Sequence, residues 1–163
     1  NKPTNLTKDE VYEILNEIIA DDSLRLSTIC WQVDDLSISG EYGFGKEDEV
    51  FINQQKGIFK KFKIEPKRLK YYSRREKGFV ISDVDTNCNA GFVIRLSFPL
   101  ISIDRQRVVI ENTEDCNCML GGQGSKDLYV KKNGLWKKEK SFDNWISRNS
   151  RTEICIIQEC FKS

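Results

Sequence analysis

The apolar positions near the start of the chain follow a helical period. Thr7 and Glu10 stand at the N-cap and N3 positions of a capping box. Leu6 and Val11 flank them as a hydrophobic staple. Apolar residues then recur three and four positions apart on one face: Val11, Ile14, Leu15, Ile18 and Ile19. We predict an amphipathic helix that ends at Asp21-Asp22-Ser23 and lies against a sheet.

The segment that continues to about residue 77 carries further helical signals. Glu47–Lys56 is expected to form a helix that Gly57 ends. Pro66 suits the first turn of a short helix that runs through Tyr71. Leu24–Val33 fits either a helix or a strand, and Glu41–Gly45 is predicted to be a glycine-rich loop.

From about residue 78 the pattern changes to that of strands. The alternation is clearest in Phe92–Leu100. Its predicted buried face consists of Phe92, Ile94, Leu96, Phe98 and Leu100. An Asn-Gly pair at Asn133-Gly134, between two such runs, is the strongest short-range signal for a hairpin. The other predicted strands are Phe79–Asp83, Arg107–Asn112, Asp127–Lys132, Leu135–Lys140 and Thr152–Phe161.

Helices followed by an antiparallel meander are typical of an α+β fold. We expect the N-terminal helices to pack on a curved antiparallel β-sheet. Residues 1–163 are predicted to form a single domain, with a helical part at about 1–77 and an antiparallel sheet part at about 78–163. The sequence shows no apolar run near the ~20 residues that a membrane-spanning helix needs. Because the chain begins without Met and without a signal-peptide pattern, we interpret it as processed.

The chain contains six cysteines and no histidine. An even number of cysteines favours disulfides formed in an oxidising compartment, whereas buried free thiols in a cytosolic protein are the alternative. A zinc site is disfavoured, because only Cys116-Asn117-Cys118 approaches a ligand spacing. Cys155 and Cys160 would face opposite sides of a strand at Ile154–Phe161 and so could not bond each other. The disulfide candidates are Cys30, Cys88, Cys116, Cys118, Cys155 and Cys160.

Charge is segregated along the chain, although the net charge is only +1. Residues 1–50 carry twelve acids and four bases, whereas residues 56–77 carry ten bases and two acids. We interpret this basic segment, 56–77, as solvated surface whose apolar members pack inward. Its alternative role is to bind an anion or a nucleic acid, since Tyr71 and Tyr72 lie among the bases. The balanced overall charge argues against nucleic acid as a partner.

Five residues are candidates for ligand binding. Asp83 and Asp85 would share one face of a strand and could hold a cation or act as an acid–base pair, but aspartates in turns usually cap their own backbone. Arg95 lies on the polar side of its strand, where it would bind a carboxylate or phosphate or remain solvated. Tyr129 and Trp136 are either core or sheet-face residues, or they bind a small ligand or a partner peptide on a concave sheet.

The sequence shows no catalytic signature. Without histidine, a serine or cysteine nucleophile lacks its usual base. Gly121–Lys126 does not have the residue order of a phosphate-binding loop and is predicted to be a tight turn between strands. Cys116 and Cys118 are expected to be structural rather than redox-active. We therefore assign no catalytic residue, metal ligand or cofactor.

Several short motifs resemble those of uncharacterised small secreted proteins and lipoproteins of Gram-negative bacteria. They are the helix Glu47–Gln55, the strand and turn Ser97–Asp104, the glycine-rich turn Cys118–Gly124 and the hairpin Tyr129–Trp136. The resemblance covers roughly residues 47–146, and Ile101 stands where these proteins usually have Phe. It implies an exported protein, often anchored by a lipid on a cysteine upstream of Asn1. It also implies a helix on a curved sheet, as in cystatin-like or nuclear-transport-factor-like folds, and no activity.

These observations lead to three functional hypotheses. The leading one is a non-enzymatic exported domain that binds or inhibits a protein or small molecule in the cell envelope. It would be periplasmic, attached to the outer membrane or extracellular, and would meet the membrane only through a removed lipid anchor. The second is a hydrolase-like or isomerase-like enzyme that uses Asp83, Asp85 or Arg95 in a cone-shaped pocket. The third is an anion or nucleic-acid binder that uses the basic segment 56–77.

Overall fold

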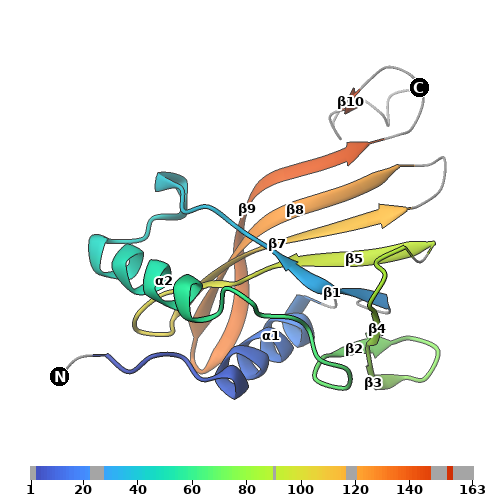
Figure 1. Cartoon of the computed structure of the whole chain (residues 1–163), viewed down its shortest axis with the longest axis horizontal. Helices are drawn as coiled ribbons and strands as arrows, with labels where there is room; N and C mark the ends of the chain where they lie inside the picture. Colours follow the sequence, from blue (N-terminus) through green and yellow to red (C-terminus); the bar gives the residue numbers. More distant parts are fainter. Residues whose placement is uncertain (1–2, 23–27, 90, 117–120, 148–153, 156–163) are drawn as a thin grey trace.

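The computed structural model describes residues 3–22, 28–89, 91–116, 121–147 and 154–155 (Figure 1). The helices are α1 (Lys8–Asp22), the short 3-10 helix η1 (Gly40–Tyr42) and α2 (Lys46–Ile58). The first strands are β1 (Thr28–Asp34), β2 (Lys70–Ser73), β3 (Gly78–Ile81), β4 (Asp83–Asp85) and β5 (Phe92–Ser97). The others are β6 (Leu100–Ile101), β7 (Arg107–Cys116), β8 (Gly122–Lys132), β9 (Leu135–Ser147) and β10 (Ile154–Cys155). The fold is therefore α+β.

One large sheet has the strand order β10-β9-β8-β7-β5-β1-β4, with β6 paired to β7 (Figure 1). The prediction of a purely antiparallel sheet is wrong, because β1 runs parallel to both β4 and β5. Between β1 and β4 the chain forms α2 and the separate β2–β3 hairpin. A connection of that length is the kind of crossover that parallel strands require. The segment Leu24–Val33, which fitted either a helix or a strand, is part of strand β1 from Thr28 onward.

Helix α1 begins as the sequence predicts. The amide of Glu10 donates to Thr7 Oγ1 at 3.1 Å, and the amide of Thr7 donates to Glu10 Oε2 at 3.4 Å, which completes the capping box. Leu6 and Val11, the two staple residues, are both buried. The predicted apolar face of this helix is buried against one side of the sheet, where it forms a core with residues such as Tyr129.

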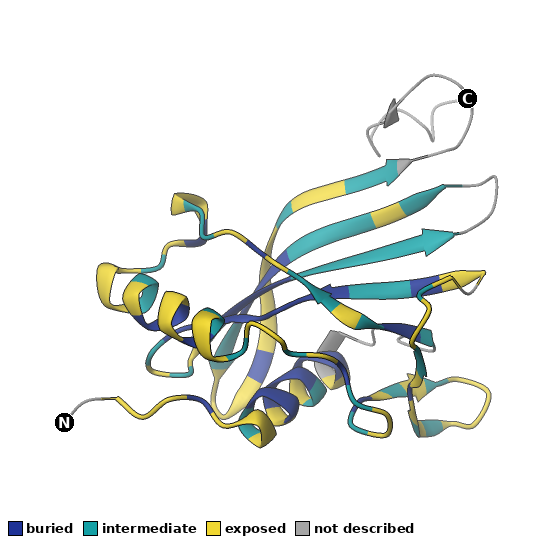
Figure 2. Ribbon diagram, viewed as in Figure 1, coloured by how far each residue is buried: buried dark blue, intermediate teal, exposed yellow. Residues whose placement is uncertain are grey.

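The other side of the sheet is covered by the chain between β1 and α2. Leu36 and Tyr42 from this connection, together with Ile52 of α2, pack on sheet residues such as Val109 and Leu128. Figure 2 shows the buried residues gathered where the strands pass α1 and α2, while the far ends of β7, β8 and β9 are half-buried or exposed. The sheet therefore has two cores near one end and an uncovered region at the other.

The hairpin predicted at Asn133-Gly134 is confirmed between β8 and β9. Both turn residues have positive φ, 52° for Asn133 and 77° for Gly134, as a two-residue type I′ turn requires. Strand β8 begins earlier than predicted, so the glycine-rich stretch is strand from Gly122 onward rather than a tight turn. Gly124 is needed there, because a Cβ would lie 2.7 Å from Nε1 of Trp145.

The predicted helix from Pro66 to Tyr71 is wrong. Lys67 adopts a positive φ of 66°, and the chain then enters β2. Tertiary contacts override the local signal, because Asn16 of α1 donates to the carbonyl of Arg68 at 2.9 Å and accepts from the amide of Lys70 at 3.1 Å. Helix α2, by contrast, forms as expected but contains Gly57 and ends at Ile58.

The alternation predicted for Phe92–Leu100 holds only in its middle. Ile94, Leu96 and Phe98 pack in the core beneath α1. Phe92 is 58% exposed, because it lies at the end of β5 away from α1 (Figure 2). Leu100 packs in the core on the opposite face, because the strand breaks at Phe98-Pro99 and the inward set of residues changes.

A disulfide joins Cys30 of β1 to Cys88 in the loop after β4. Their Cα atoms are 4.9 Å apart, and the bond closes a loop with a sequence separation of 58. Cys116 is also disulfide-bonded. The predictions for Cys118 and Cys160, and for the strand after Cys155, lie outside the described residues. Among the described helices, none is long and apolar enough to cross a membrane.

Candidate functional site

Two of the five candidate ligand residues lie in the core. Tyr129 has no exposed surface and Trp136 is 3% exposed, and both belong to the core that contains the apolar face of α1. The indole Nε1 of Trp136 donates to Glu17 Oε2 of α1 at 2.7 Å. The two rings therefore hold α1 on the sheet. Tyr129 and Trp136 are core residues rather than ligand-binding residues on an open face of the sheet.

Asp83 and Asp85 lie on β4, the last strand in the order of the large sheet. Asp83 is exposed. Asp85 accepts from the amide of Asn87 at 2.8 Å and from the amide of Asn89 at 3.0 Å. Its carboxylate thus caps the following turn, as aspartates in turns commonly do. Among the described residues, no group of acidic or cysteine side chains is arranged to hold a metal ion.

Arg95 lies in β5 and pairs with Asp34 at the end of β1, with Nε 3.7 Å from Oδ2. This side chain is therefore paired rather than free in solvent. The structure does not bring the five candidates together. It brings Arg95 only to the rim of a pocket that Asp34 helps to line.

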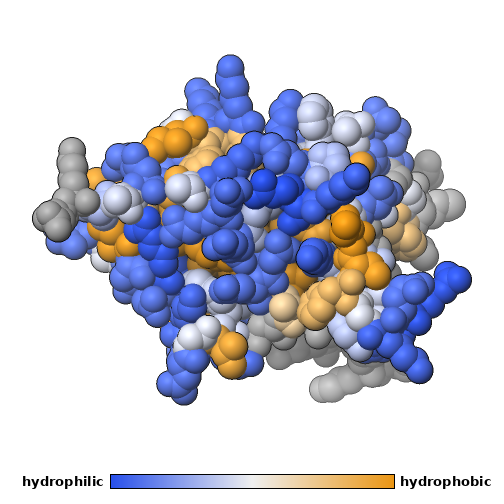
Figure 3. Space-filling view, turned by 90° about the horizontal axis from the view of Figure 1, so that it is seen from below, coloured by the Kyte–Doolittle hydropathy of each residue, from blue (hydrophilic) through white to orange (hydrophobic). Residues whose placement is uncertain are grey.

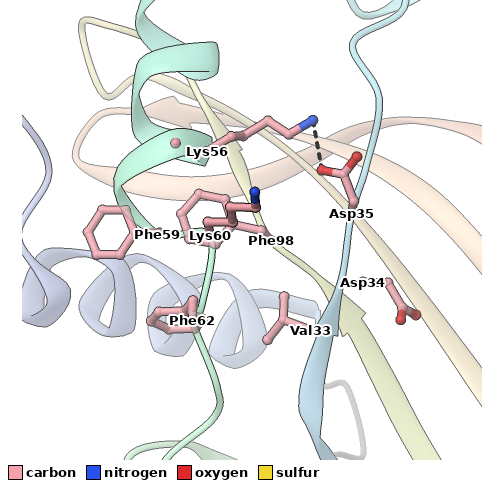
Figure 4. A pocket seen from close by; sticks show the side chains of 9 residues that line it. Val33, Asp34, Asp35, Lys56, Phe59, Lys60, Phe62 and Phe98 are labelled. Carbon is pink, nitrogen blue, oxygen red and sulfur yellow. Dashed lines mark ion pairs between the residues drawn. The ribbon is translucent and has the colours of Figure 1, made fainter.

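That pocket lies between the end of β1 and the end of α2 (Figure 4). Its volume is about 410 Å³, within the usual range for small-molecule sites. The lining residues are Val33, Asp34, Asp35, Lys56, Gly57, Phe59, Lys60, Phe62 and Phe98. We call it the β1–α2 pocket. It joins an apolar interior to a charged rim.

Three phenylalanines form the apolar wall of the β1–α2 pocket. The rings of Phe59 and Phe98 are stacked with centroids 5.4 Å apart, and Phe62 meets Phe98 edge-on at 5.6 Å. Tyr12 of α1 supports this wall from behind, with its ring 5.4 Å from that of Phe62. Burial raises the pKa of Tyr12, which donates its hydroxyl to the carbonyl of Lys63 at 3.2 Å. The wall is thus fixed by contacts with α1.

The rim carries two lysines and two aspartates. Lys56 Nζ lies 2.8 Å from Asp35 Oδ1 and donates to the carbonyl of Leu36 at 3.0 Å, so this ion pair joins α2 to the segment just after β1 (Figure 4). The carboxylate of Asp34 points away from the phenylalanine rings (Figure 4), toward Arg95. Within the described structure, no ion pair or hydrogen bond engages the amine of Lys60. The available charge at the mouth is therefore positive.

The residues that line the β1–α2 pocket were not expected to lie together. Phe59 and Phe62 were predicted to pack inward, and Lys60 belonged to the basic segment 56–77. One signal of the pocket is present in the sequence. Two aromatic rings flank a pair of lysines just after a helix, in Phe59-Lys60-Lys61-Phe62. The partners on β1 and at Phe98 could not be found, because their position depends on the parallel pairing of β1 with β5.

A second pocket of about 550 Å³ lies between the N-terminal segment and α2. Its lining includes Pro3, Phe51 and Val50, and Val50 is 70% exposed. Although this pocket is larger, Phe51 is the one aromatic ring among the described residues of its lining, whereas the β1–α2 pocket has three. We therefore regard the β1–α2 pocket as the better candidate.

A buried polar cluster occupies the sheet between β7 and β9. Asp127 is completely buried and accepts hydrogen bonds from Ser125 Oγ at 2.8 Å and Ser141 Oγ at 2.5 Å. Asn112 donates to it at 3.4 Å, and Lys138 Nζ lies 3.5 Å away. The carboxylate is satisfied by its neighbours, as a buried charge must be. We interpret the cluster as structural.

Comparison with known proteins adds no assignment: no family model matches this chain, and no curated protein or solved structure matches it. The geometry of the β1–α2 pocket is therefore the basis for a functional proposal.

Proposed function

We propose that this chain is an exported binding domain that holds a small amphipathic anion in the β1–α2 pocket. The observation that carries the proposal is the combination of a phenylalanine wall with an unengaged lysine, Lys60, at the mouth. The ligand would have a flat apolar body and one carboxylate or phosphate. The resemblance to secreted proteins and lipoproteins of Gram-negative bacteria supports a place in the cell envelope.

The apolar body of such a ligand would lie against Phe59, Phe62 and Phe98. Removing apolar surface from water contributes about 25 cal/mol per Å². Aromatic pairs in offset or edge-on arrangements add to that burial energy. A flat ring system fits these walls better than a flexible polar molecule, because the rings already stand in stacked and edge-on arrangements.

The acidic group of the ligand would meet Lys60. Lys56 is less available, since its amine already contacts Asp35 and a backbone carbonyl. An exposed ion pair contributes up to about 1 kcal/mol, which corresponds to about fivefold in affinity. Lys60 is therefore expected to select for anions, while the phenylalanine wall supplies most of the affinity.

The export part of the proposal is supported by the disulfide between Cys30 and Cys88. Disulfides persist in oxidising compartments and are rare where glutathione and thioredoxin keep thiols reduced. The bond joins the strand that leads to the pocket with the loop after β4. In an oxidising cell envelope the disulfide would persist and would continue to hold β1 beside the pocket.

The test uses two probes of the same shape, 2-naphthoate and the neutral 2-naphthol, in titration calorimetry with the oxidised chain. We expect saturable binding of both, with the anion about fivefold tighter. Lys60→Met should remove the preference for the anion and leave 2-naphthol unchanged. The matched control Lys61→Met changes a neighbouring exposed lysine that does not line the pocket and should alter neither value.

Two results would refute the proposal. Absence of saturable binding of both probes would remove the pocket as a site for a flat apolar body. An equal loss of anion preference in Lys60→Met and Lys61→Met would show that general surface charge, not the pocket, selects the anion.

A further inference from the structure

The β2–β3 hairpin forms a small sheet of its own, apart from the large one (Figure 1). Its register pairs Tyr71 with Val80 and Tyr72 with Phe79. Tyr71 packs against the core beneath α1 and is half-buried, as is Val80. One face of the hairpin is therefore attached to the body of the protein.

The opposite face of the hairpin is apolar and exposed. Tyr72, Phe79 and Ile81 are 42%, 54% and 52% exposed, and the register places them on one side. The rings of Tyr72 and Phe79 meet edge-on, with centroids 5.6 Å apart. Figure 3 shows that the surface seen from below is mostly hydrophilic with separate apolar patches. Adjacent exposed side chains of this kind commonly mark an interaction site.

The tip and the base of the same hairpin are basic. Arg74, Arg75 and Lys77 are exposed in the turn, and Lys70 is exposed opposite Ile81. Within the described residues, the only ion pair that any of these four forms is between Arg75 and its neighbour Glu76, at 3.9 Å. The side chain of Arg75 remains 94% exposed. These cations are thus available to a partner outside the chain.

We propose that the outer face of the β2–β3 hairpin docks on an anionic lipid surface. Tyr72, Phe79 and Ile81 would enter the boundary between headgroups and acyl chains, and the basic tip would meet the lipid phosphates. This inference goes beyond the proposed ligand pocket and does not depend on it, since no residue of the hairpin lines that pocket.

The composition of the face favours lipid over nucleic acid. Nucleic-acid surfaces use flat rings on which bases stack, whereas Ile81 is aliphatic and gains only from burial in an apolar medium. Anionic lipid offers both of the partners that this face needs: a negative surface for the four cations and an apolar layer for the three exposed apolar side chains.

The first experiment measures co-sedimentation of the oxidised full chain with vesicles. Vesicles of phosphatidylcholine alone are compared with vesicles that contain a third phosphatidylglycerol. We expect binding only to the anionic vesicles, with an affinity that falls as salt is raised. Arg74→Ser with Arg75→Ser should weaken it about twenty-five-fold, because each basic residue near an anionic surface contributes about fivefold.

Matched controls test whether the hairpin itself is the site. Lys46→Ser with Lys132→Ser removes two exposed lysines elsewhere and should change binding much less than the arginine pair. Phe79→Ser should weaken binding at every phosphatidylglycerol content. Leu135→Ser, which removes another exposed apolar side chain at 62% exposure, should leave binding unchanged. Equal effects of the two charge pairs, or equal binding to both kinds of vesicle, would overturn the proposal.

A second readout places the hairpin in the lipid. The chain has three tryptophans of its own, so each variant is compared with wild type. The emission that Phe79→Trp adds to the wild-type spectrum should shift to shorter wavelength when anionic vesicles are added, whereas the emission that Leu135→Trp adds should not. Absence of the shift in Phe79→Trp would also overturn the proposal. So would tighter binding of single-stranded DNA than of anionic vesicles, because the surface would then belong to a nucleic-acid partner.

Discussion

The disulfide between Cys30 and Cys88 encloses most of the candidate site. The loop that it closes runs from β1 through α2 and the β2–β3 hairpin to the segment after β4. Every lining residue of the β1–α2 pocket except Phe98 lies within this loop. Removing the bond in the double variant Cys30→Ala with Cys88→Ser should therefore affect both stability and binding.

The expected loss of stability follows from the length of the loop. Cross-linking restricts the unfolded chain, and for a sequence separation of 58 the loop-entropy relation gives about 4 kcal/mol at 25 °C. Cys30 is fully buried, so alanine at this position keeps an apolar side chain in the core. That loss is a large share of the ~5–15 kcal/mol by which an ordinary domain is stable.

Urea unfolding followed by circular dichroism measures the effect. The double variant should show a lower free energy of unfolding and a larger dependence on urea, because its unfolded state exposes more surface without the cross-link. Wild-type protein treated with a reductant provides a comparison in which every disulfide is opened. 2-Naphthoate should bind the folded double variant more weakly, since β1, which helps to line the pocket, is no longer linked covalently to the loop after β4.

A loss below about 1 kcal/mol with an unchanged dependence on urea would refute this reasoning. It would mean that the unfolded chain is already restricted in this region, or that contacts across the large sheet hold the loop without the bond. The affinity for 2-naphthoate separates the effect of the disulfide on stability from its effect on the pocket. Unchanged affinity for 2-naphthoate with reduced stability would show that the disulfide stabilises the fold but does not shape the pocket.

Three further predictions concern single side chains. Thr7→Ala should lower the free energy of unfolding by about 1 kcal/mol, because α1 loses its cap, and urea unfolding would show it. Gly124→Ala should cost about 1–3 kcal/mol, since the new Cβ would stand 2.7 Å from Nε1 of Trp145; a thermal melt equal to wild type would contradict this. Burial raises the pKa of Tyr12 above its ordinary value of 10.0, so its contribution to stability is complete below that pH and is lost as the pH rises through the folded-state value. Tyr12→Phe should therefore weaken the decline of melting temperature above pH 10, although it removes two hydrogen bonds.

Local signals in the sequence predicted the elements whose stability is local. The capping box at Thr7 and Glu10 and the turn at Asn133-Gly134 depend on residues adjacent in the chain, and both form. The helix expected after Pro66 does not form, because the side chain of Asn16 in α1, more than fifty positions away, holds the backbone of Arg68 and Lys70. Leu100 lies on the unexpected face because the strand breaks at Phe98-Pro99, which changes the set of residues that points inward.

The candidate pocket could not be predicted as a pocket. Its walls come from β1, from the end of α2 and from the segment after β5, and these meet only because β1 pairs in parallel with β5. Single-sequence patterns do not specify strand order. The sequence could indicate which rings were apolar and which lysines were charged, but not that Phe98 would stack on Phe59 at 5.4 Å.

The fold also shows which cations of the basic segment 56–77 have partners within the protein. Three of its cations are engaged within the molecule: Lys56 pairs with Asp35, Lys63 lies 3.8 Å above the ring of Trp31, and Arg68 pairs with Asp9 at 2.7 Å. Two of these partners, Asp9 and Asp35, belong to the acidic region 1–50, so part of the charge asymmetry serves the fold. Among the cations that remain available, Lys60 lies at the mouth of the pocket, and Arg74, Arg75 and Lys77 lie at the tip of the β2–β3 hairpin. The basic segment thus contains cations that stabilise the fold and cations on two separate surfaces. Substitutions in those two surfaces should act independently, because the residues share no partner.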